Sequence, residues 1–86
     1  MLLMGCSKSM HSSTVIKCFG ASVRKLRHSL GISQEELAER ADLHRTYVTD
    51  IERGARNPTL ITIKKLAKGL GVSAADLLSE IKCTGC

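Results

Sequence analysis

The sequence predicts an all-α fold, a compact bundle of five helices in a single domain. The 86 residues suffice for one modest core, and 43% of them are hydrophobic. Aromatic residues make up only 2% and there is one Pro, so aliphatic side chains must fill that core, which is typical of packed helices rather than sheets. Apolar residues also recur at helical spacing from residue 13 onward.

The first predicted helix covers residues 13–30. Its apolar residues are three or four positions apart, as one buried face of a helix requires. They are Val15, Phe19, Val23, Leu26 and Leu30. Charged residues such as Arg24 and Lys25 fall on the opposite face, and Gly31 is expected to end the helix.

The second predicted helix begins after Ser33. Glu36 stands three positions further on, which predicts a capping box in which each side chain bonds the other residue's backbone N–H. The helix is expected to end near Asp42, because a short polar side chain tolerates a left-handed backbone. The residues expected to be buried are Leu37, Ala38 and Ala41.

The third predicted helix runs from about residue 45 to 53, with Val48 and Ile51 buried and Gly54 at its end. A turn at 57–58 separates it from the fourth helix, which Thr59 caps and Gly71 closes. The inner face of the fourth helix consists of Leu60, Ile63, Leu66, Ala67 and Leu70.

A short fifth helix is predicted after Ser73, with Asp76 in its first turn favoured by the helix dipole. Its apolar residues are Leu77, Leu78 and Ile81. These are more than one small core needs, which indicates that part of this helix contacts another chain.

These elements predict three segments: a flexible tail over 1–12, in which Met10 is an alternative natural start, a folded domain over 13–82 and a second tail over 83–86. The cysteines Cys6, Cys18, Cys83 and Cys86 lie outside the periodic middle, so we expect reduced thiols that the core does not need. Metal binding or redox sensing through the last two is the weaker alternative.

Charge is segregated along the chain, which carries a formal net charge of +5. Residues 1–33 and 53–68 contain basic but no acidic residues, whereas the segment between them is acidic. Such a balance suits a polyanionic partner, either nucleic acid or a membrane surface. No apolar run approaches the length of a membrane span, so we expect no membrane association and a cytoplasmic location.

The segment 33–54 predicts two short helices joined by a tight turn, the unit that fits the DNA major groove. Ala38 is small where the helices must cross, and Leu43 can fill the core from the turn. The outward residues at the start of the third predicted helix can all donate hydrogen bonds to base edges or accept them. They are His44, Arg45, Thr46, Thr49 and Asp50.

At these positions the sequence resembles the lambda-repressor/Cro-like, or XRE-type, helix-turn-helix family. The resemblance covers residues 19–79. It rests on Gly31-Ile32-Ser33-Gln34-Glu35-Glu36-Leu37-Ala38, Ile51-Glu52-Arg53-Gly54, Asn57-Pro58-Thr59-Leu60 and Leu70-Gly71-Val72-Ser73. Asp42 stands where the family often has Gly, and His44-Arg45-Thr46 is particular to this chain, so no operator sequence is implied.

The resemblance implies a lambda-repressor-like DNA-binding domain in which helices two and three form the helix-turn-helix. It implies transcriptional regulation, with repression as the expected mode, by a homodimer on a palindromic operator in double-stranded DNA. It also implies that Gln34 anchors a phosphate and supports the recognition helix, and that Arg27 and Glu52 form a structural ion pair. Such a pair is expected because a charge beside an apolar face is tolerated mainly when paired.

Individual roles follow from residue chemistry. Arg45 is expected to read a guanine through its fork of donors, with a phosphate contact as the alternative. Asp50 either reads cytosine, excludes wrong bases by repulsion or pairs locally. Further phosphate contacts are expected from Tyr47, Arg53, Arg56 and Asn57. The dimer interface is expected at Ile61, Leu77, Leu78 and Ile81.

Two other functions remain open. The chain is alternatively a protein-interaction module such as an antitoxin or coactivator, which would show no salt-sensitive duplex binding. A thiol- or metal-responsive regulator is the other alternative. An enzyme is disfavoured because the periodic region holds no nucleophile–base set, and the sequence indicates no cofactor, metal or small-molecule ligand.

Overall fold

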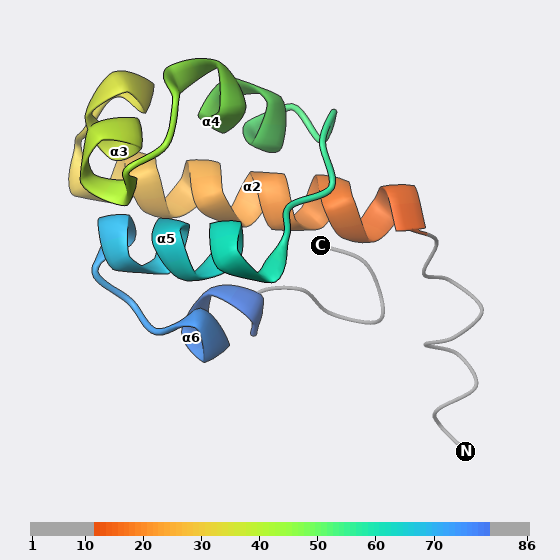
Figure 1. Cartoon of the computed structure of the whole chain (residues 1–86). Helices are drawn as coiled ribbons and strands as arrows, with labels where there is room; N and C mark the ends of the chain where they lie inside the picture. Colours follow the sequence, from red (N-terminus) through yellow and green to blue (C-terminus); the bar gives the residue numbers. More distant parts are fainter. Residues whose placement is uncertain (1–11, 80–86) are drawn as a thin grey trace.

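The computed structural model describes residues 12–79, and within them it contains five helices and no strand. Their bounds are α2 (Ser12–Leu30), α3 (Gln34–Ala41), α4 (Arg45–Glu52), α5 (Leu60–Leu70) and α6 (Ala74–Leu78). The long α2 crosses the middle of the molecule, with α4 packed on one side and α5 and α6 on the other (Figure 1). The predicted all-α fold is confirmed.

Short polar side chains cap the helices at the expected places. Ser33 accepts from Glu36 N at 3.0 Å, Thr59 from Thr62 N at 3.1 Å and Ser73 from Asp76 N at 3.0 Å. Glu36 does not return the bond of the predicted capping box; its carboxylate pairs instead with Arg40 one turn later, at 2.7 Å. Oppositely charged groups four positions apart on an exposed helix face attract each other, and that attraction draws Glu36 away from the helix end.

The core lies between α2 and the four shorter helices and is almost entirely aliphatic. Its largest fully buried side chains are Leu37, Ile51, Leu66, Leu77, Val23, Val48 and Cys18. Two predicted core residues lie outside it: Leu30 is 47% and Leu60 is 73% exposed. Leu30 is the last residue of α2 and Leu60 the first of α5.

Cys18 also differs from expectation. It is fully buried in α2 and disulfide-bonded, so the prediction of a reduced thiol outside the packed region is wrong for this residue. The buried face of α2 is wider than a single line of residues and includes Cys18, Ser22 and their neighbours Phe19 and Val23. The remaining three cysteines lie outside the described residues.

A glycine allows α2 and α4 to touch. A Cβ placed on Gly20 would lie 2.2 Å from the carbonyl oxygen of Ile51 and 3.1 Å from that of Glu52. These are backbone atoms at the end of α4, which cannot move aside without shifting the helix. The close approach of the two backbones at Gly20 therefore determines where the last turn of α4 lies.

A buried ion pair joins the same two helices nearby. Arg27 on α2 donates through Nε to Glu52 Oε2 at 2.6 Å and through Nη2 to Oε1 at 3.0 Å. The side chains are 11% and 4% exposed. Arg27 Nη1 also donates to the carbonyl oxygen of Ile32 at 2.9 Å, so the guanidinium ties the segment before α3 to the same point. The ion pair is the one implied by the family resemblance.

Replacing Gly20 by Ala is expected to lower the free energy of unfolding by about 1–3 kcal/mol, because overpacking against fixed backbone forces the helices apart. Urea unfolding followed by circular dichroism measures it. Ala21→Ser, at the exposed neighbouring position of α2, is the control and should leave the midpoint nearly unchanged. Equal stabilities for the two variants would contradict the close approach.

Replacing Arg27 by Met is expected to cost about 3–5 kcal/mol of unfolding free energy, because it leaves the Glu52 carboxylate buried without its counter-ion. Arg40→Met is the matched control: its partnership with Glu36 is about half exposed on both sides, and such pairs contribute roughly 0–1 kcal/mol. The same urea titration measures both variants. A loss of similar size in both would show that the buried pair contributes no more to the free energy of unfolding than the exposed pair.

Candidate nucleic-acid interface

Helices α3 and α4 form the predicted helix-turn-helix. The turn consists of the residues between Ala41 and Arg45, and Asp42 within it adopts the left-handed conformation, with φ 58° and ψ 49°. Ala38 is buried where the helices meet, and Leu43 packs partly buried against the core. The turn therefore follows the predicted geometry.

The first turn of α4 offers its polar side chains to solvent. His44, Arg45 and Thr46 are exposed, whereas Thr49 and Asp50 in the second turn are half-buried. Val48 and Ile51 are fully buried on the opposite side of the same helix. Recognition helices place their N-terminal residues against base edges, and the exposed group stands at that end.

His44 has a role that the sequence analysis missed, because it caps α4. Its Nδ1 accepts from the backbone N–H of Thr46 at 3.2 Å. A ring nitrogen that accepts carries no hydrogen, so the neutral ring holds its proton on Nε2 and can donate from that atom. Ser, Thr, Asp and Asn are the usual capping residues, and a histidine before a helix gives little signal of this role.

Asp50 pairs locally, which is one of its predicted roles. Its carboxylate lies 3.3 Å from Arg56 Nη2 and 3.9 Å from Arg53 Nη1. The Arg56 guanidinium also stacks over the ring of Tyr47, 4.6 Å from its centroid. Asp50 and Tyr47 thus hold Arg56 beside the end of α4, the first through an ion pair and the second through a cation–π contact.

Thr62 is a further residue that the sequence analysis did not single out. It is a buried polar residue on α5 and donates to the hydroxyl of Tyr47 at 3.2 Å, while its own Oγ1 lies 3.0 Å from Thr59 Oγ1. Its position three residues after the cap Thr59 was the only available signal. The contact orients the ring on which Arg56 stacks.

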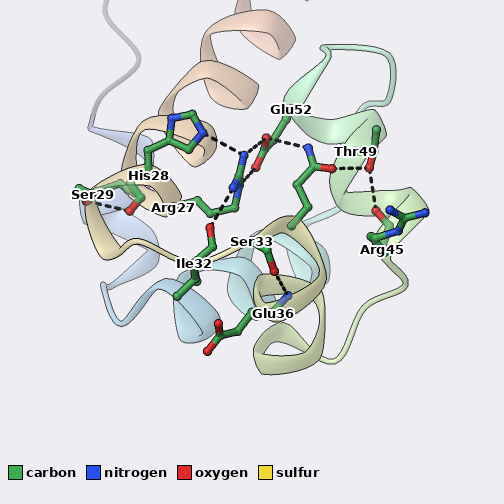
Figure 2. A network of polar contacts seen from close by, with 11 residues as sticks. Arg27, His28, Ser29, Ile32, Ser33, Glu36, Arg45, Thr49 and Glu52 are labelled. Carbon is green, nitrogen blue, oxygen red and sulfur yellow. Dashed lines mark hydrogen bonds and ion pairs between the residues drawn. The ribbon is translucent and has the colours of Figure 1, made fainter.

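Gln34, at the first position of α3, links the two helices of the motif. Its Nε2 donates to Glu52 Oε1 at 3.0 Å, and its Oε1 accepts from the Thr49 hydroxyl at 2.9 Å. The carboxylate of Glu52 is the one that pairs with Arg27, so the polar contacts run without interruption from α2 to the second turn of α4 (Figure 2). The remaining expected phosphate ligands, Arg53 and Asn57, are exposed.

The residues expected at a dimer interface fall into different environments. Ile61 is 69% and Leu78 39% exposed, whereas Leu77 is completely buried in the core of its own chain. Ile81 lies outside the described residues. Ile61 and the exposed Leu60 line a groove of ≈ 790 Å³ between α5 and the start of α6, with lysines at its edge. Leu77 therefore has no surface to offer a second chain.

Within residues 12–79 no group of three or more His, Cys, Asp or Glu side chains is placed to hold a metal ion. In the same part of the chain, no helix has the length and apolar character that crossing a membrane requires. Cys83 and Cys86 lie outside that range.

Known proteins share this arrangement. A family model described as helix-turn-helix matches residues 23–77. The chain is 51% identical over 69 residues to the control protein C.BamHI of Bacillus amyloliquefaciens, covering 79% of this chain and 85% of that protein. It is 36% identical over 61 residues to the immunity repressor of Bacillus phage phi105, covering 71% of this chain and 42% of the repressor.

Among solved structures, the restriction-modification controller protein C.AhdI from Aeromonas hydrophila superposes with a TM-score of 0.69 at 44% sequence identity. The superposition covers 73% of this chain and 94% of the controller. The likeness therefore holds in both sequence and backbone. The chain belongs to the XRE-type helix-turn-helix family.

Proposed function

We propose that this chain is a sequence-specific transcriptional regulator that binds a palindromic operator as a homodimer, with α4 in the major groove. The observation that carries the proposal is the exposed first turn of α4, held on two crossed helices with His44, Arg45 and Thr46 facing outward. Relatives named as control proteins and as an immunity repressor support regulation of restriction-modification or phage genes, with repression as the mode.

Base reading is assigned mainly to Arg45. Its guanidinium has no partner within the described residues, so both prongs of its fork are available to guanine O6 and N7. Thr46, also exposed and without a side-chain partner there, and the Nε2 donor of His44 flank it. Together these groups present mainly hydrogen-bond donors, which suits the acceptor-rich edge of guanine.

Phosphate binding is assigned to Gln34, Tyr47, Arg53, Arg56 and Asn57. Arg56 is held in place by Asp50 and the Tyr47 ring, so little side-chain freedom remains to be lost when it meets a phosphate. The lysines of α5 add to a positive surface that attracts the duplex at longer range. Asp50 contributes by orienting Arg53 and Arg56 through its carboxylate.

Dimerisation is assigned to the apolar surface around Ile61, Leu60 and Leu78. Leu60 and Ile61 are exposed at the groove beside α5, and Leu78 is exposed on α6. A second copy of the chain would cover all three side chains. A dimer places two recognition helices about one helical turn, roughly 34 Å, apart on the duplex. The proposed role involves no catalysis and places the protein with the DNA in the cytoplasm.

Arg45→Ala is expected to lower affinity for the preferred duplex and to relax selection at one base pair, with about 1–3 kcal/mol of discrimination lost. Arg45→Lys is the control because it keeps the charge but not the fork; selection should relax in this variant too. The bound duplexes selected from a random pool provide the measurement. If Arg45→Ala bound more weakly but selected the same half-site as the wild type, Arg45 would contact phosphate instead.

The salt dependence of duplex binding, measured by gel shift, separates this function from a protein-interaction module. A dimer that neutralises about four phosphates per subunit should show log affinity falling with log salt at a slope of about −7. Absence of salt-sensitive duplex binding would favour the interaction module.

Ile61→Asp is expected to convert the dimer to a monomer, because it would bury a charge at the apolar interface. Sedimentation equilibrium measures the mass. Leu30→Asp, an equally drastic change at an exposed leucine on α2, is the control and should remain dimeric. A dimer that persists in Ile61→Asp would place the interface elsewhere.

A further inference from the structure

The hydrogen of the Thr49 hydroxyl is committed within the protein. Its Oγ1 lies 2.9 Å from Gln34 Oε1 and 3.1 Å from the carbonyl oxygen of Arg45. Both partners are acceptors, and a hydroxyl has a single hydrogen to give. Thr49 therefore has no hydrogen left to donate to a base edge or to a phosphate.

The orientation of the Gln34 amide follows from the chemistry of Glu52. A carboxylate accepts and cannot donate, and Glu52 receives three hydrogen bonds, two from Arg27 and one from Gln34 Nε2. The amide NH₂ must therefore face Glu52, which turns Oε1 toward Thr49. A flipped amide would place its oxygen against the carboxylate and its NH₂ against the hydroxyl, losing the bond to Glu52.

One hydrogen of the Gln34 amide remains. Nε2 carries two hydrogens, and Glu52 takes one of them. Gln34 is half-buried at the start of α3, and its amide is hydrogen-bonded on one side to Glu52 and on the other to Thr49 of α4. A fixed neutral donor next to the recognition helix suits a phosphate oxygen of the DNA backbone.

We propose that Thr49 is a positioning residue that holds Gln34 for a backbone phosphate, and that it does not read a base. The proposal rests on the proposed function and deepens it, because it confines sequence reading to His44, Arg45 and Thr46 in the first turn. The second turn of α4 then sets affinity, while the first turn sets sequence preference. The buried pair of Arg27 and Glu52 anchors the far side of Gln34.

Two substitutions at position 49 separate these roles. Thr49→Val keeps the shape and the methyl group but replaces the hydroxyl with a second methyl, whereas Thr49→Ser keeps the hydroxyl and loses the methyl. Their affinities are measured on the selected operator and on a set of duplexes that carry each single base-pair change. Thermal unfolding of each variant verifies that it is folded at the assay temperature.

Thr49→Val is expected to bind every duplex about threefold to tenfold more weakly, the effect of one lost hydrogen bond, with the order of the duplexes unchanged. Thr49→Ser should stay within about twofold of the wild type, because the hydroxyl still holds Gln34. In a Gln34→Ala background, Thr49→Val should cause no further loss, because the side chain that it positions is already gone. Thr46→Val is the matched control in the first turn and should change the order of the duplexes.

Three results would overturn the positioning role while leaving the regulator intact. They are a changed preference at one base pair in Thr49→Val, a loss in Thr49→Ser as large as that in Thr49→Val, and independent, additive losses from Thr49→Val and Gln34→Ala. Failure of the wild-type chain to bind any duplex would instead overturn the proposed function, and this role with it.

Discussion

The buried pair of Arg27 and Glu52 is the interaction on which the recognition surface depends. It is the point where α2, the segment before α3 and the end of α4 meet, since the guanidinium bonds both the carboxylate of Glu52 and the carbonyl of Ile32. Glu52 in turn holds Gln34. Gly20 lies against the same end of α4. Electrostatic attraction and close backbone packing thus act together on one helix end, and the opposite end of that helix is free to face DNA.

Most of the fold could be predicted because it follows from local rules. The helical spacing of apolar residues and the capping residues Ser33, Thr59 and Ser73 placed three helix starts correctly. The errors arise where tertiary contacts decide. Leu30 and Leu60 share the spacing of core residues, yet they are 47% and 73% exposed. Cys18 lies in the core because the buried face of α2 is wider than its apolar periodicity suggested.

For the site, the exposure of side chains could be predicted from the sequence, but the contacts between helices could not. Exposure of His44, Arg45 and Thr46 follows from the burial of Val48 and Ile51 on the other face, and helical geometry alone gives that result. The contacts of Gln34 with Thr49 and Glu52 depend on the crossing of separate helices, which no local pattern encodes. Leu77 and Leu78 illustrate the same limit, because adjacent apolar residues on a short helix do not reveal which one faces inward.

The histidine cap of α4 bears on how related proteins can diverge. The imidazole caps the helix through its Nδ1, and the residue is exposed. If His44 contacts a base as proposed, the same ring serves both the helix start and recognition, and a substitution at this position affects both. Asp, Asn, Ser and Thr keep an acceptor for the helix start, so these residues can replace His44 and still cap α4.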